Sequence, residues 1–198
     1  MQHLLLVQQV LHHGVVVNDE RGGWVLIAYR TPKQPSTARV AAWRRLHRLG
    51  ALYVGPSTCL LPAGLADERA LATVAEGIIS GGGSIDRFPI TAFAPEAERA
   101  LLERFNAERD AEYAEVVERA VALVAELDRE SERGRFTFAE VEENEAELTK
   151  LRRWLTAVTG RDRYGAAGRG PAEAAVEEAD RRLHEFTERS VSGEGGAS

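Results

Sequence analysis

The sequence predicts an α+β fold, in which a ferredoxin-like βαββαβ layer is followed by a three-helix, coiled-coil-like extension. Between Trp24 and Ala92, short apolar runs alternate with amphipathic segments and are separated by glycine and proline, as in a small mixed α/β layer. After Pro95, long stretches without proline or glycine carry apolar residues at helical spacing. We therefore expect an arm at 1–23, an α+β domain at 24–94, a helical extension packed on it at 95–190 and a disordered tail at 191–198.

The first half of the α+β domain follows from its apolar patterning. The run WVLIAYR at 24–30, followed by Pro32, predicts a buried strand. Ser36 or Thr37 can cap a helix at 37–49. Apolar residues spaced by three along this helix are expected to face the core; they are Val40, Trp43, Leu46 and Leu49.

The second half of the domain repeats this pattern. ALYV and TCLL flank Gly55-Pro56 and predict two strands, with Cys59 as a buried apolar residue. A helix is expected at 65–80, and Gly81–Gly83 are expected to end it as a cap and turn. Its expected core residues are Leu65, Leu71, Val74, Ile78 and Ile79. The alternating segment at 84–92 predicts the last strand.

Three helices are expected in the extension. The first spans about 96–133, the second starts near Phe138, and a loop at 160–170 leads to a third that has Pro171 at its start. The first helix carries an apolar stripe of Tyr113, Val116, Ala120, Val124 and Leu127. The heptad-like spacing of Val141, Leu148 and Leu155 in the second, and of Val176, Ala179, Leu183 and Phe186 in the third, favours a helical bundle.

Several classes of site are not expected. The single cysteine excludes a disulfide within the chain and a thiolate metal cluster. The histidines lack metal-ligand spacing, and the acidic run from Glu140 to Glu147 lacks the E-x-x-H pairs of a carboxylate metal site, so we expect a solvated face there. The chain has no G-x-S-x-G motif and no paired general acid and base, so we do not expect an enzyme. No signal peptide, membrane segment, metal or cofactor is expected.

One segment stands out by its charge. From Trp24 to Ala66 the chain has no Asp or Glu, but it has six cations: Arg30, Lys33, Arg39, Arg44, Arg45 and Arg48. The chain as a whole has a net charge of −6, and acids outnumber bases between Glu96 and Glu147. An acidic chain can hold one cationic face, although wrapping nucleic acid over its whole surface is disfavoured.

Three interpretations of this segment are open. The loop that carries Arg30 and Lys33 leads into a helix start, and Arg39 lies in the first turn, so their donors could bind a tetrahedral oxyanion. Further along the helix, Arg44, Arg45 and Arg48 are better suited to a nucleic-acid backbone or an acidic partner helix. In the third interpretation, the cations form a solvated face that pairs with the acidic C-terminal helices.

Two stretches carry a family resemblance. The run from Arg30 to Pro62 resembles the opening domain of ChrB-like chromate-resistance proteins, and the stretch from Phe105 to Ala166 resembles its helical continuation. The most specific pieces are the R-x-x-x-W-R-x-L helix, which starts at Arg39, and the K-L-R-R-W-L segment at 150–155. The resemblance covers roughly residues 24–189. It implies a chromate-sensing regulator encoded beside a chromate efflux pump, with a second, C-terminal domain that these 198 residues do not reach.

More remotely, the first domain resembles the ferredoxin-like module of phenylacetate-type repressors and of small CRISPR-associated nucleases. The nucleases have an acid at the end of the first strand, where this chain has Tyr29 and Arg30, so metal-dependent nuclease activity is not expected. The repressors carry a winged helix ahead of the module, and the 23 residues before Trp24 are too few to form one.

We therefore expect a cytoplasmic, non-catalytic regulatory or sensor module of the chromate response. It would bind chromate or another tetrahedral oxyanion, promoter DNA, or both, through the basic loop and helix. The alternative is a structural module whose long helices form a homodimer or dock a separate C-terminal-domain protein.

Overall fold

The computed structural model describes residues 23–33, 37–134 and 137–194. The chain divides into two compact units, unit 1 (Met1–Ala94) and unit 2 (Pro95–Ser198). The arm predicted at 1–23 lies outside the described residues, apart from Gly23.

Unit 1 contains a four-stranded antiparallel sheet in the order β2-β3-β1-β4. The strands are β1 (Trp24–Arg30), β2 (Leu52–Gly55), β3 (Thr58–Pro62) and β4 (Ser84–Ile90). Helix α2 (Thr37–Arg48) connects β1 to β2, and helix α3 (Glu68–Ser80) connects β3 to β4. Each helix therefore joins two strands that are separated in the sheet by one strand, so two split βαβ units interlock. The predicted α+β class is confirmed.

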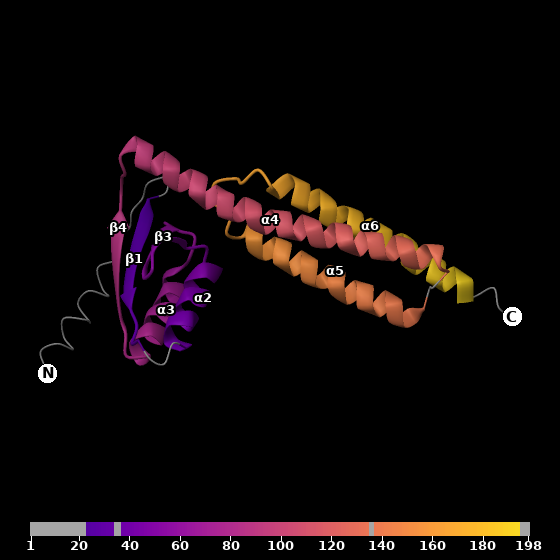
Figure 1. Cartoon of the computed structure of the whole chain (residues 1–198), viewed down its shortest axis with the longest axis horizontal. Helices are drawn as coiled ribbons and strands as arrows, with labels where there is room; N and C mark the ends of the chain where they lie inside the picture. The colour runs from indigo at the N-terminus through magenta and orange to yellow at the C-terminus, as the bar shows by residue number, and fades with distance from the viewer. Residues whose placement is uncertain (1–22, 34–36, 135–136, 195–198) are drawn as a thin grey trace, which may run out of the picture. The chain divides into compact units, whose positions relative to one another are not determined.

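Figure 1 shows α2 and α3 on the same face of the sheet. Alternate residues of β1, such as Ile27 and Tyr29, point to this face and pack with Leu46 of α2 and Val74 of α3. The alternation follows from the strand period of two, which sends successive side chains to opposite faces.

The residues of α2 that face the core differ from the predicted ones. Ala42 and Leu46 are buried, whereas Val40 and Trp43 are 41% and 45% exposed, so their predicted core position is wrong. Residues three apart are rotated by about 300° around a helix, so a stripe spaced strictly by three drifts away from one face. Residues four apart, such as Ala42 and Leu46, remain closer to the same line.

The turn between α3 and β4 is built by the predicted glycine run. Gly82 has a φ of +77°, in the left-handed region that glycine tolerates. The N–H of Gly82 donates to the carbonyl of Ile79, and that of Gly83 donates to the carbonyl of Ile78, both at 2.9 Å. These bonds satisfy the last carbonyls of α3 and confirm the cap and turn. Ile79, predicted in the core, is 52% exposed.

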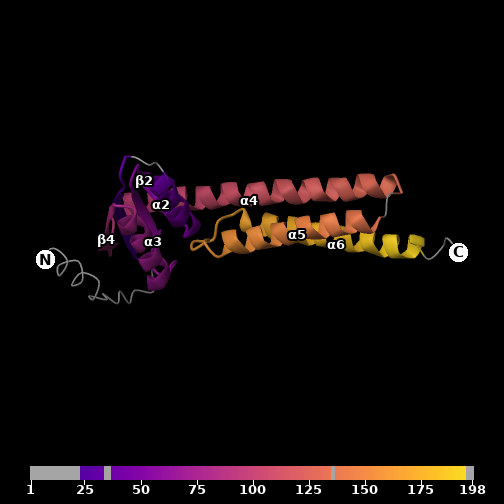
Figure 2. The ribbon, with the colours of Figure 1, turned by 90° about the horizontal axis from the view of Figure 1, so that it is seen from below.

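Unit 2 consists of three helices in its described part: α4 (Pro95–Glu132), α5 (Phe138–Thr159) and α6 (Arg169–Glu194). Each helix contacts the other two, and Figures 1 and 2 both show them running alongside one another. The core side chains come from all three helices and include Val116 and Leu127 of α4, Leu148 and Leu151 of α5, and Leu183 and Phe186 of α6. Helix α6 continues through residues 191–194, which the sequence assigned to a disordered tail.

Two polar caps explain where helices begin. The carboxylate of Asp67 accepts from the N–H of Ala70 at the start of α3. At the start of α5, Thr137 and Glu140 form a reciprocal capping box. Within the described ranges, none of the helices combines the length and apolar character needed to cross a bilayer.

Candidate functional site

The outward face of α2 is both cationic and aromatic. Arg44 and Arg48 are exposed on consecutive turns, and Trp43 is exposed beside them. The Trp43 ring stacks on the His47 imidazole, with ring centroids 5.1 Å apart and planes 11° from parallel. The Nε of Arg48 donates to the carbonyl of Arg44 at 3.2 Å, which draws its side chain back along the helix. We call Trp43, Arg44, His47 and Arg48 the α2 face.

Arg45 belongs to a different surface of the same helix. Its guanidinium lies against α3 at Gly77: a Cβ atom added to this glycine would meet Nη1 of Arg45 at 1.8 Å. Because residue 77 has no side chain, the two helices leave room for an arginine between them. The structure thus separates Arg45 from Arg44 and Arg48, which the sequence grouped together.

The three residues predicted to bind an oxyanion are exposed. Arg30 ends β1, where it pairs with Ser84, Lys33 follows in the loop, and Arg39 lies in the first turns of α2. Residues 34–36, including the predicted cap Ser36, lie outside the described ranges. Their joint binding of an oxyanion stays a prediction.

The predicted cations of unit 1 lack acidic partners. Among the described residues, none of the six has a carboxylate within ion-pair distance, whereas Arg87 of the same unit pairs with Glu68 at 2.6 Å. In unit 2 most of the ion pairs join arginines to nearby carboxylates, as Arg152 does with Asp180 at 2.6 Å.

Cys59 is fully buried in β3, as predicted. Burial raises the pKa of its thiol from the usual 9.0 to about 12. Because the thiolate is the reactive form, this environment suits a packing residue better than a nucleophile or a redox sensor.

We therefore expect Cys59 to react with a thiol-specific disulfide reagent at pH 8 roughly a thousandfold more slowly in the folded chain than in denaturant. The pKa difference alone lowers the thiolate fraction by about that factor, and burial slows access further. Absorbance of the released thiol, followed with and without denaturant, measures the ratio. Comparable rates in both conditions would contradict a buried, protonated thiol.

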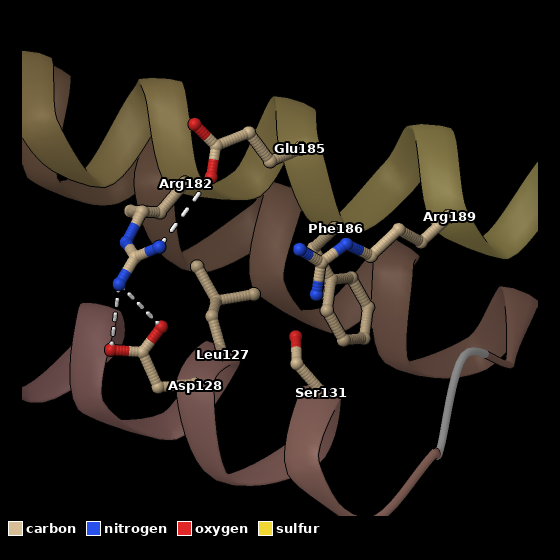
Figure 3. Close-up of a pocket in the computed structure, with 7 residues that line it drawn as sticks. All are labelled: Leu127, Asp128, Ser131, Arg182, Glu185, Phe186 and Arg189. Atoms are coloured by element: carbon tan, nitrogen blue, oxygen red, sulfur yellow. Dashed lines mark hydrogen bonds and ion pairs between the residues drawn. The ribbon is translucent and has the colours of Figure 1, made fainter.

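A small pocket of about 40 Å³ lies between α4 and α6 (Figure 3). Arg182 in its wall binds Asp128 at 2.8 Å and Glu185 at 3.4 Å, so two carboxylates already compensate this charge. The pocket has room for a few water molecules, and we interpret it as the surroundings of an ion pair between two helices.

The glutamates of the acidic run in α5 are mostly exposed to solvent, and one of them forms an ion pair within the helix. Glu142, Glu143 and Glu145 are exposed, and Glu147 pairs with Lys150 at 3.0 Å. Within the described ranges, no group of three potential ligand side chains is placed to hold a metal ion.

Unit 2 holds a buried polar cluster that the sequence interpretation missed. Arg109 of α4 is fully buried, and its Nη2 binds the Glu112 carboxylate at 2.8 Å. The other carboxylate oxygen of Glu112 binds Nη2 of Arg161, which lies just beyond the end of α5. A signal was present: the apolar stripe through Tyr113 and Val116 extends back by fours to Arg109 and Phe105.

The segment that carries Arg161 is fixed to α4 by two carboxylates. Asp162 accepts from the Tyr113 hydroxyl at 3.2 Å and from the backbone N–H groups of Gly165 and Ala166 at 2.9 and 3.0 Å. Asp110 of α4 accepts from the N–H of Gly168 at 2.7 Å. Burial is the main reason that the pKa of Tyr113 is raised.

Comparison with known proteins gives one informative result. The family model described as "Protein ChrB, N-terminal" matches residues 39–195. The matched region begins within α2 and ends one position after α6, so it includes the α2 face and the Arg109 cluster but not Arg30 or Lys33. No similar chain was found among curated proteins or among solved structures. The chain therefore belongs to the ChrB N-terminal domain family, as its helix motifs predicted.

Proposed function

We propose that this chain is a non-catalytic regulatory module of the chromate response, and that it contacts DNA through the α2 face. Membership of the family links the chain to chromate resistance. The observation that carries the DNA proposal is the exposed Trp43, stacked on the half-buried His47, beside two exposed arginines that have no acidic partner among the described residues.

The geometry of α2 suits a groove of duplex DNA. A helix of 12 residues is roughly 18 Å long, and the major groove is about 12 Å wide, enough to admit one helix. Arg44 and Arg48 lie four residues apart, so both guanidinium groups project from one side and can reach phosphates or guanine edges. The flat Trp43–His47 stack offers an apolar surface for sugars or thymine methyl groups.

The charge distribution supports a local contact instead of a wrapped one. The net charge of −6 disfavours adhesion of the whole chain to DNA, and the acids are concentrated outside residues 24–66. A protein with this distribution approaches a polyanion by one face. Arg30, Lys33 and Arg39 add to the same positive potential.

We also infer that unit 1 is a ferredoxin-like domain and that unit 2 packs as a short coiled coil. The strand order β2-β3-β1-β4 supports the first inference, because it is the order that two split βαβ units produce. The apolar spacing of α5 supports the second.

The DNA proposal is tested with the full chain and fluorescent duplexes, one from the region upstream of its own gene and one of random sequence. We expect the double variant Arg44→Ala/Arg48→Ala to weaken binding at least tenfold at 0.1 M salt. The slope of log affinity against log salt should become shallower by about 2, because two phosphate contacts release fewer counterions. Fluorescence anisotropy over a salt series measures both quantities.

Arg45→Ala is the matched control, since it removes an arginine from the same helix but on the side that faces Gly77. We expect it to change affinity by less than about threefold. If the wild-type chain binds neither duplex at low salt, or if the double variant and the control bind alike, the proposal fails. Binding to an acidic protein partner but not to either duplex would assign the α2 face to a protein interface instead.

A further inference from the structure

We propose that the buried cluster around Arg109 and Arg161 in unit 2 is a binding site for a small tetrahedral oxyanion. The two guanidinium groups belong to one cluster because they bind opposite oxygens of the same carboxylate, Glu112. The site lies in a different unit from the α2 face and does not depend on DNA binding.

The position of Arg109 is unusual for a charged residue. Its side chain is 0% exposed and continues the line of core residues along α4, between Phe105 and Tyr113. The centre of the Phe105 ring lies 5.1 Å from the guanidinium carbon, and the rings of Phe105 and Tyr164 meet edge to face with their centroids 5.3 Å apart. Arginine is almost never this deeply buried unless its charge and its donors are matched.

The donors of this cluster are not matched by the described part of the chain. Nε and Nη1 of Arg109 and Nε of Arg161 are buried and have no hydrogen-bond partner among the described residues. The Oδ1 atom of Asn106, three residues before Arg109, is by contrast a buried acceptor without a partner among the described residues. A buried donor without a partner costs about 1–3 kcal/mol, more for a charged group, so folded chains rarely keep several in one place without a ligand or ordered water.

The chemistry of the free donors indicates the class of ligand. Glu112 occupies only the Nη2 atoms, and Glu108 is 3.4 Å from the same atom of Arg109, so nitrogen donors on both arginines remain. One oxygen atom accepts from about two donors, whereas three donors on the two guanidinium groups lack a partner among the described residues. A tetrahedral oxyanion presents several acceptor oxygens, so one such ligand can accept from donors on both arginines.

The site is also held in place before any ligand arrives. Two hydrogen bonds that do not use the arginines join the segment after α5 to α4, from Tyr113 to Asp162 and from Gly168 to Asp110, and Asp162 also accepts from two N–H groups within the segment. The position of Arg161 relative to Arg109 therefore does not depend on an anion. Binding to such a preformed site loses little conformational entropy.

Equilibrium dialysis of the full chain against radiolabelled sulfate, phosphate and chromate tests the proposal. We expect one anion per chain for at least one of the three, and at least a tenfold loss of affinity in Arg161→Gln, whose side chain is 17% exposed, compared with 0% for Arg109. Arg109→Met should abolish binding. Arg44→Ala/Arg48→Ala should bind the anion as the wild type does, which separates this site from the α2 face.

Glu112→Gln is expected to raise anion affinity, whereas the arginine variants lower it. The change removes the carboxylate that competes for both Nη2 atoms, so we expect anion affinity to rise at least fivefold even though the apo chain loses stability. A merely structural role would lower stability and leave anion binding unchanged. Glu147→Gln, which breaks the exposed pair with Lys150, controls for the change in net charge and should leave affinity within twofold.

Three outcomes would overturn the proposal. One is binding of none of the three anions above background, which would show that water satisfies the donors. Another is unchanged binding in Arg161→Gln, and the last is equal gains in Glu112→Gln and Glu147→Gln. If Arg109→Met does not fold, the remaining variants still decide.

Discussion

Replacing Gly83 by alanine is expected to destabilise unit 1 by roughly 3 kcal/mol. A Cβ atom at this position would lie 2.2 Å from the carbonyl oxygen of Arg30 and 2.9 Å from Cγ2 of Ile78. The first of these is backbone in the central strand β1, so it can move only if β1 and β4 separate. The close approach explains why the chain has glycine between α3 and β4.

Gly55→Ala is the control in the same unit, because its nearest atom would be 3.7 Å away, at ordinary van der Waals distance. We expect this control to change the free energy of unfolding by less than about 0.5 kcal/mol. Urea unfolding gives the free energies, and hydrogen exchange of the α2 and α3 amides locates the loss in unit 1. A cost for Gly83→Ala no greater than that of the control would show that β4 does not approach β1 this closely.

The second large effect is expected at Asp162. Its carboxylate is the common acceptor for the Tyr113 hydroxyl and for two backbone N–H groups of the loop between α5 and α6. In Asp162→Ala these donors lose their partner at once, and one of them belongs to a fully buried tyrosine. We expect unit 2 to lose about 3 kcal/mol of stability.

Asp162→Asn separates the hydrogen bonds from the charge. The amide oxygen can still accept from the loop N–H groups, so we expect less than half of the loss seen with alanine. Tyr113→Phe removes a single donor together with its bond and should cost about 1 kcal/mol. Urea unfolding with hydrogen exchange of α5 and α6 measures all three variants, and equal losses in the alanine and asparagine variants would contradict this assignment.

Much of the fold was predictable because local patterning and tertiary packing agree. Both ends of the strand at 24–30 were predicted correctly, since a short apolar run bounded by glycine and proline is typical of a buried strand. The first long helix was predicted within one residue at each end, from Pro95 and from the break at Gly134. The glycine run at 81–83 was assigned correctly as a helix cap because it follows a helix and precedes a strand.

The candidate sites were predictable only in part. An acid-free segment is visible in the sequence, and the structure leaves its cations without acidic partners among the described residues. Which cations act together was not visible, because Arg44 and Arg45 are neighbours in sequence but lie on different sides of α2. Trp43 was assigned to the core from its apolar character, whereas the rotation of the helix places it outside.

The sequence by itself determined the α+β class, the order of the helices and strands, the charge segregation and the resemblance to the ChrB family. These features depend on neighbours along the chain, where spacing and composition act directly. Only the tertiary structure decided that Glu112 joins Arg109 to Arg161, which is 52 positions after Arg109, and that Arg45 lies against Gly77. Contacts at such separation depend on how helices are rotated and packed against one another, and no local pattern records that rotation.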